Sequence, residues 1–117
     1  MYGRPVAPAD LKTNHERAKQ MEKKELPEWL KENADGSVDI TLAGKKRLTI
    51  DGVEVTALRM REPTVDDQLA QEKIQGSAAE KEIGLMANLC QVTPAQISGL
   101  SLRNYKRVQA AFVGFTD

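Results

Sequence analysis

The sequence is poor in the residues from which reactive sites are most often built. Its 117 residues include one cysteine, one histidine and 4% aromatic side chains. The single cysteine, Cys90, excludes a disulfide within the chain, which fits a reducing cytosol. The single histidine, His15, stands in a polar stretch without the partners that catalysis or metal binding requires. We therefore predict no catalytic residue, no metal ligand and no cofactor, and a protein that works by binding.

The sequence also lacks an excess charge and a long apolar run. Lysine plus arginine and aspartate plus glutamate both number 17, so the formal net charge is zero. A dedicated binder of nucleic acid or of anionic membranes normally carries a basic excess, whereas a neutral chain has little protection against self-association. No apolar run approaches the ~18 residues of a membrane span, and residues 1–5 lack the apolar core of a secretory signal. These features favour a soluble protein of the cytosol.

Residues 1–36 predict a charged N-terminal arm that is partly helical or disordered. Large apolar side chains are scarce there, and residues 12–25 are mostly charged, so a helix would have little to pack against. Pro27 suits a first helical position and predicts one more turn. The arm is either a solvated leader or a segment that orders on a partner, with Trp29 and Leu30 as its anchors.

The next stretch predicts a small antiparallel sheet. Apolar and polar side chains alternate over residues 38–42, 47–50 and 53–60, which is typical of half-buried strands. Asp51-Gly52 is a strong signal for a two-residue hairpin. Leu58 and Met60 fall on the opposite parity from the apolar residues before them, which indicates a β-bulge or a strand covered on both faces. We predict a three-stranded antiparallel meander over about 38–61.

Four helix starts follow the predicted sheet. Pro63 ends the sheet, because proline cannot donate to a ladder. Each start has a serine or threonine cap, and two of them have the Glu or Gln three residues on that completes a capping box. The caps are Thr64, Ser77, Thr93 and Ser101. We therefore predict an α+β fold class, with a three-stranded antiparallel meander followed by three to four packed helices in one domain over residues 37–117.

The last two predicted helices offer a rival interpretation. Residues 89–108 read like a helix-turn-helix, whose second helix carries Arg103, Lys106 and Arg107. Such residues can meet phosphates or base edges. However, the same spacing occurs in any compact helix pair, and a neutral chain lacks the broad basic footprint of DNA binding. A small DNA-binding regulator is therefore the alternative function rather than the leading one.

The order of several features resembles a known family. They are the Asp51-Gly52 hairpin, the run Leu58-Arg59-Met60-Arg61-Glu62-Pro63-Thr64, the acidic pair Asp66-Asp67, the helix of residues 83–90 and the later Gln96-Ile97-Ser98-Gly99-Leu100. Over residues 38–117 this order resembles the tail assembly chaperones of Mu-like and P2-like contractile-tailed bacteriophages. The arm of residues 1–36 is longer and more charged than the usual start of that family.

The resemblance implies a non-catalytic role in virion morphogenesis. Such chaperones coat the long, apolar tape measure protein and keep it soluble until tail tube subunits polymerise around it, a step that they help to initiate. The resemblance therefore implies the tape measure protein and the tail tube protein as partners. The zero net charge adds the expectation of self-association and of no membrane or nucleic-acid partner. The resemblance also implies action in the host bacterial cytoplasm and absence from the mature virion. The family often makes a longer product by ribosomal frameshifting, with which an end at Asp117 is compatible.

A chaperone of this kind needs apolar surface that is exposed alone and covered in the complex. The candidate partner-binding residues are Trp29, Leu30, Leu58, Met60, Phe112 and Phe115. They come from the arm, the last strand and the end of the last helix. The alternative is that they form the core, because a folded part of about 80 residues needs most of its large apolar groups inside.

Overall fold

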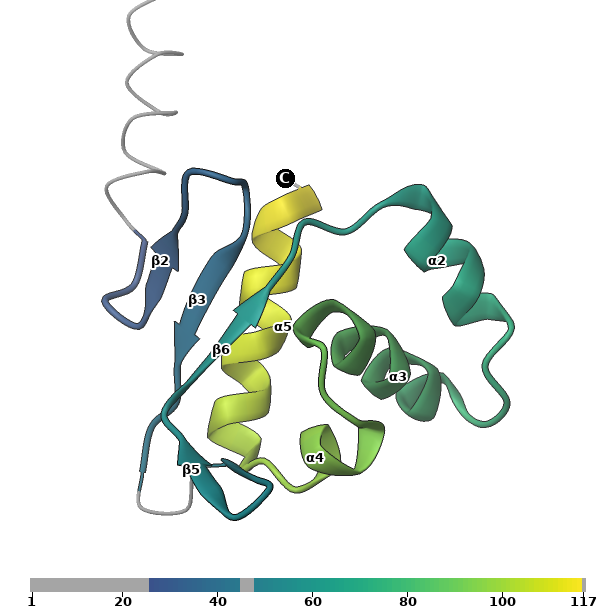
Figure 1. Ribbon diagram of the computed structural model, residues 1–117. Coiled ribbons are helices and arrows are strands. Elements are labelled where there is room, and N and C mark those ends of the chain that lie inside the picture. The colour runs from purple at the N-terminus through teal and green to yellow at the C-terminus, as the bar shows by residue number, and fades with distance from the viewer. Residues whose placement is uncertain (1–25, 45–47, 117) are drawn as a thin grey trace, which may run out of the picture.

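The computed structural model describes residues 26–44 and 48–116, and these form an α+β fold (Figure 1). Its strands are β2 (Leu30–Glu32), β3 (Val38–Thr41), β4 (Leu48–Ile50), β5 (Val53–Val55) and β6 (Ala57–Met60). Its helices are α2 (Val65–Glu72), α3 (Ala78–Cys90), α4 (Pro94–Ser98) and α5 (Leu102–Thr116). The predicted fold class, three antiparallel strands followed by packed helices, is confirmed. The predictions for His15 and for the rest of residues 1–25 lie outside the described residues.

The three-stranded sheet has the order β2-β3-β6, with both pairs antiparallel. Ile40 lies in the middle of the ladder, opposite Leu30 on one side and Leu58 on the other. The strands that form this sheet are not the ones expected from the sequence. Among the described strands, β4 and β5 pair with each other in a separate sheet, and β2 is the third strand beside β3 and β6. The sheet thus extends ahead of residue 37, where we expected the domain to begin.

The first strand of the sheet is preceded by a tight turn rather than by the predicted helical turn. The backbone N–H of Leu30 donates to the carbonyl of Pro27 at 3.0 Å, which closes the turn. The chain then pairs with β3 over three residues. A strand of this length, Leu-Lys-Glu, is too short to show a period of two in its sequence, so only its pairing reveals it.

The predicted Asp51-Gly52 hairpin is confirmed. Asp51 and Gly52 have φ of 52° and 80°, as a two-residue turn between antiparallel strands requires. Thr56 then separates β5 from β6, and its carbonyl accepts a hydrogen bond from the N–H of Leu42 at 2.9 Å. The parity slip before Leu58 therefore marks the place where the chain leaves its pairing with β4 and joins β3.

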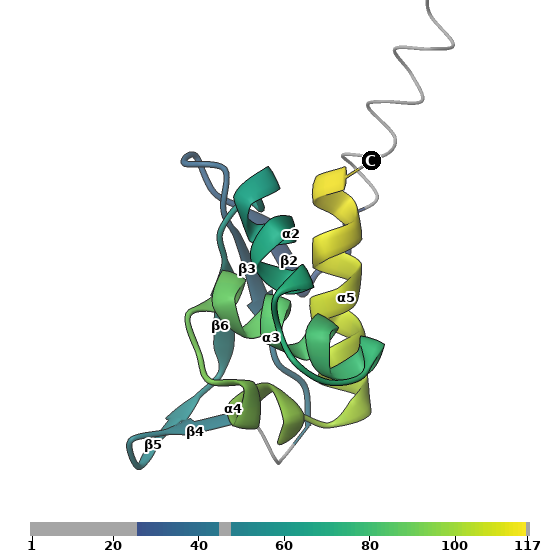
Figure 2. The ribbon, with the colours of Figure 1, turned by 90° about the vertical axis from the view of Figure 1, so that its right-hand side faces the viewer.

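The helices α3 and α5 cover one face of the sheet and enclose the core between the layers (Figure 2). Strand residues that oppose each other in the ladder, such as Ile40 and Leu58, point together into this core. The helices contribute Leu89, Ile97 and Val108 to it. The other face is open to solvent, where Arg59 binds Asp39 at 2.8 Å. An antiparallel sheet with one covered and one solvated face is common.

The helix starts follow the capping residues of the sequence. Thr64, Ser77 and Thr93 each accept a hydrogen bond from the backbone N–H three residues on, and the side chain at that position bonds back to the cap. These reciprocal bonds satisfy N–H groups that a helix end otherwise leaves free. Because each cap is local, the start of α2, α3 and α4 could be predicted from the sequence alone.

Candidate partner-binding groove

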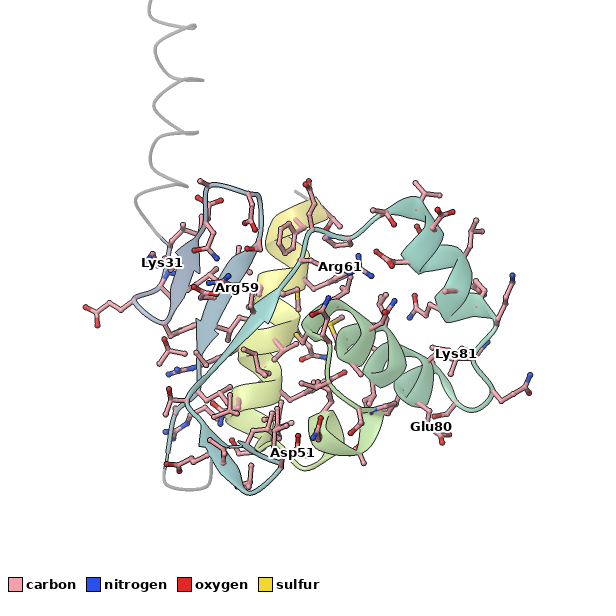
Figure 3. All side chains as sticks on the ribbon, viewed as in Figure 1. Lys31, Asp51, Arg59, Arg61, Glu80 and Lys81 are labelled. Atoms are coloured by element: carbon pink, nitrogen blue, oxygen red, sulfur yellow. The ribbon has the colours of Figure 1, made fainter. Side chains whose placement is uncertain are left out.

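The junction between β6 and α2 is fixed by one charged pair. The Arg61 guanidinium donates two hydrogen bonds to the Asp67 carboxylate, both of 2.7 Å, and Figure 3 shows Arg61 at the end of β6 beside α2. The same carboxylate accepts a bond of 2.8 Å from the backbone N–H of Thr64. The side chain of Asn88 in α3 donates to it at 3.3 Å. One carboxylate thus connects the sheet, the first turn of α2 and the end of α3.

These contacts stabilise the charged form of Asp67. The hydrogen bonds from Arg61, followed by those from Thr64, hold the pKa of the Asp67 carboxyl well below its usual range, although its burial acts in the opposite direction. The Asp67 side chain is 9% exposed and that of Arg61 38%. Such a bidentate pair is geometrically specific. The pair therefore fixes the position of the first turn of α2 relative to the end of β6.

An open groove of about 450 Å³ lies between α2, α3 and the C-terminal part of α5. We call it the α2–α5 groove. The apolar side chains of its floor are Leu85, Met86, Phe112 and Phe115. The remaining lining residues are Pro63, Thr64, Val65, Asp67, Gln68, Gln71, Glu82 and Thr116. The groove therefore has an apolar floor and a largely polar rim, which is the usual composition of a protein binding site.

Apolar surface continues from the floor of the groove onto α2. Phe112 and Phe115 are only partly buried, and Val65 on the opposite wall is 74% exposed. Leu69, one helical turn after Val65, is also exposed. Exposed apolar side chains that gather around a concave site indicate a surface that a partner covers. The groove thus unites two of the six candidate residues, Phe112 and Phe115, with neighbours from α2.

Glu82 is the first of the α3 residues that line the groove, one helical turn before Leu85 and Met86. Its carboxylate accepts a hydrogen bond of 2.8 Å from the hydroxyl of Tyr105 and bonds of 3.2 and 3.3 Å from the side-chain amide of Gln109. Burial, together with the bond to Glu82, raises the pKa of the Tyr105 hydroxyl. Glu82 precedes Met86 by four residues and Leu89 by seven, so it is an acidic residue at an apolar-face position of the helix. An acidic residue at an apolar-face position is the signal by which the sequence could have identified Glu82 as a functional residue.

Leu58 and Met60 do not contribute to an exposed surface. They are 4% and 0% exposed, and both belong to the hydrophobic core. The reason is the change of pairing partner at Thr56, which turns them to the same face as Val38 and Ile40. That face is the one covered by α3 and α5. Of the two sequence alternatives for Leu58 and Met60, the structure places them in the core.

Trp29 and Leu30 lie apart from the α2–α5 groove. The guanidinium of Arg107 sits over the Trp29 ring, 5.1 Å from its centroid, and donates a hydrogen bond of 2.7 Å to the carbonyl of Thr41. Leu30 pairs with Ile40 in the sheet. Both side chains are partly buried against the core. They therefore help to attach β2 to the rest of the sheet and to α5.

The basic residues of the helix-turn-helix interpretation are divided in the structure. Arg107 is committed to Trp29 and Thr41, whereas Arg103 and Lys106 are exposed. The presumptive recognition helix is α5, which packs on β3 and α3 through a face that includes Asn104 and Val108. A recognition helix needs one face free to enter a groove of DNA. Here α5 is a central helix of the core, and only two of the three predicted basic residues are free on its surface.

Among the described residues, the acidic side chains, Cys90 and the helices bear on metal binding, nucleophilic chemistry and membrane insertion. Within residues 26–44 and 48–116, no three histidine, cysteine, aspartate or glutamate side chains gather closely enough to hold a metal ion. The Cys90 thiol is buried, and burial raises its pKa to about 12, whereas a nucleophilic cysteine has a lowered pKa. In the same part of the chain no helix combines the length and apolarity needed to cross a membrane. The α2–α5 groove is therefore the candidate site, and its apolar floor suits the binding of a partner.

The described residues form a small α+β domain, and comparison with known proteins assigns its family. The family model described as phage tail assembly chaperone proteins, E, or 41 or 14, matches residues 39–117. The matched range contains every residue that lines the groove. The chain belongs to this family of phage tail assembly chaperones, as the resemblance of its sequence predicted. Neither the curated proteins nor the solved structures that were searched contain a match.

Proposed function

We propose that the α2–α5 groove binds apolar segments of the tape measure protein and keeps that protein soluble during tail assembly. The observation that carries this proposal is the partly exposed pair Phe112 and Phe115 on the floor of a groove, facing the exposed Val65. A chaperone must expose apolar surface when alone and cover it in the complex. Membership of the tail assembly chaperone family makes a tail protein the expected occupant.

The remaining parts of this function follow from the same role. The chaperone leaves as tail tube subunits polymerise around the tape measure protein, helps to initiate that polymerisation, and is absent from the mature virion. Its net charge of zero offers little electrostatic resistance to self-association, so several copies are expected to line one long partner. All of this takes place in the cytoplasm of the host bacterium.

The test is co-purification with the tape measure protein encoded beside this chain. The tagged wild type is expected to retain it, whereas the double variant Phe112→Ala/Phe115→Ala is expected to lose most of it. Val113→Ala is the matched control, because Val113 is exposed on the same helix but does not line the groove. A wild type that retains no tape measure protein would overturn the proposed function.

A second control tests the basic surface of α5, on which the alternative DNA-binding function depends. The variant Arg103→Ala/Lys106→Ala removes the two exposed basic residues of α5 and spares Arg107, which supports Trp29. We expect this variant to retain the tape measure protein as well as the wild type does. Loss of retention in this variant alone would point to the basic surface of α5 instead of the groove.

A further inference from the structure

The two carboxylates that line the groove are in different electrostatic states. Asp67 is paired with Arg61, whereas the partners of Glu82 within residues 26–44 and 48–116 are the neutral side chains of Tyr105 and Gln109. Among the described residues, no lysine or arginine pairs with Glu82, and none lines the groove. In the part of the chain that the structure describes, the α2–α5 groove therefore presents one negative charge without a cationic partner next to its apolar floor.

A partner that occupies the groove covers the Glu82 carboxylate. When a partner covers a half-buried carboxylate, it removes water from the ion, and this is costly unless a positive group replaces the water. The two neutral donors, the Tyr105 hydroxyl and the Gln109 amide, fix the orientation of the Glu82 carboxylate without neutralising it. A carboxylate that is held in place loses little further freedom when a cation binds.

We propose that the groove selects segments in which an apolar stretch is accompanied by a lysine or arginine, and that this cation pairs with Glu82. The inference deepens the proposed function and rests on it, since it names the kind of tape measure segment that the groove binds. Apolar side chains of the segment pack on Leu85, Met86 and Phe112, while its cation lies beside Glu82. A purely apolar segment would bury Glu82 unpaired and bind more weakly.

The spacing of the groove residues specifies the segment further. Leu85 and Met86 follow Glu82 by three and four residues in α3, which corresponds to about 4.5 and about 6 Å along the helix axis, or roughly one turn. In the partner segment, the distance between the cation and the nearest buried apolar side chain should therefore be about the length of one helical turn. The occupant has the character of an amphipathic segment with a basic residue at the edge of its apolar side.

The test uses overlapping synthetic peptides that span the tape measure protein encoded beside this chain, titrated against the full-length protein. We expect the tightest peptides to carry a lysine or arginine beside an apolar stretch. Replacing that residue by glutamine should raise the Kd about tenfold, and Glu82→Gln should raise the Kd of the unaltered peptide by a similar factor. Glutamine can still accept the bond from Tyr105, so the fold is expected to persist, which circular dichroism verifies.

Two further variants separate charge pairing from a structural effect. Glu72→Gln, at the exposed end of α2 and outside the groove lining, should leave every Kd unchanged. Glu82→Lys should weaken the original peptide and restore binding of a peptide whose basic residue is replaced by glutamate. Such rescue by charge exchange is expected only if the two groups meet.

The outcomes distinguish this inference from the function on which it rests. If peptides bind and Phe112→Ala weakens them while Glu82→Gln does not, the groove is confirmed and the role of Glu82 is overturned. Equal binding of purely apolar peptides would have the same meaning. If the wild type binds no peptide of the tape measure protein, the proposed function fails, and the inference about Glu82 fails with it.

Discussion

Arg61 at the end of β6 and Asp67 in the first turn of α2 form a bidentate pair, with both N–H···O distances at 2.7 Å. Asp67 follows Arg61 by six positions, and Pro63 and Thr64 lie between them. Because Asp67 also accepts from Thr64 and Asn88, this single pair fixes α2 against the sheet and α3. The wall of the α2–α5 groove is thereby held in place before a partner arrives.

Removal of this pair should cost far more stability than removal of the exposed pair on the open face of the sheet. Arg61→Ala leaves the nearly buried Asp67 without its cation and should lower the free energy of unfolding by about 2 kcal/mol, less than for a fully buried pair because Arg61 is partly solvated. Arg59→Ala, whose pair with Asp39 is exposed and screened by solvent, should change the unfolding free energy far less. Urea unfolding measures both. Equal losses would contradict the role given to Arg61.

The same pair predicts a pH dependence. The pKa of Asp67 is lowered in the folded state, so its contribution to stability is complete above the unfolded value of about 3.9 and is lost as the pH falls towards the folded value. We therefore expect the wild type to exceed Asp67→Asn in unfolding free energy by a constant amount near neutral pH. The difference should shrink below about pH 4. A difference that stays constant under acid conditions would be inconsistent with the lowered pKa.

Asn104 should be among the costliest polar residues to replace. It is fully buried, and its side-chain amide accepts from the N–H of Ala43 at 2.7 Å and donates to the carbonyl of Ala43 at 3.0 Å. Asn104→Ala leaves both backbone groups unsatisfied and should lower the free energy of unfolding by about 3 kcal/mol. Asn88→Ala, which removes one long bond from an exposed side chain, should cost less than about 1 kcal/mol. Thermal or urea unfolding distinguishes the two.

Met60 provides a test of core against surface. Because Met60 is fully buried, Met60→Ala should lower the free energy of unfolding by about 3 kcal/mol through loss of burial and formation of a cavity. At a temperature where the variant is still folded, its affinity for the tape measure protein should equal that of the wild type. If Met60→Ala weakens binding without a loss of stability, Met60 contacts the partner and the assignment to the core is wrong.

The sequence predicted best those features that depend on neighbouring residues. The capping boxes at Ser77 and Thr93 and the hairpin at Asp51-Gly52 are complete within a few residues, so each is visible without knowledge of the fold. The parity slip before Leu58 was also visible. Its meaning was not, because a slip can arise from a bulge, from a strand covered twice or, as here, from a change of pairing partner.

Features that depend on distant residues could not be predicted in the same way. The strand Leu30–Glu32 exists because β3 offers it an edge, and three residues carry no periodic signal. Asn104 is polar at a buried position of α5, and its partner Ala43 is 61 residues away. Phe112 and Phe115 were recognised as candidates, but the wall that α2 sets opposite them depends on Arg61 and Asp67. The groove is therefore a property of the tertiary fold.

If the groove keeps the tape measure protein soluble, the most direct measurement is the soluble fraction of the tape measure protein after co-expression with this chain. Sedimentation of lysates should leave the tape measure protein in the supernatant with the wild type and with Val113→Ala. The tape measure protein should move to the pellet with Phe112→Ala/Phe115→Ala, and circular dichroism of the purified variant should show that it is itself folded. If the double variant keeps the tape measure protein in solution as well as the wild type does, the groove is not its binding site.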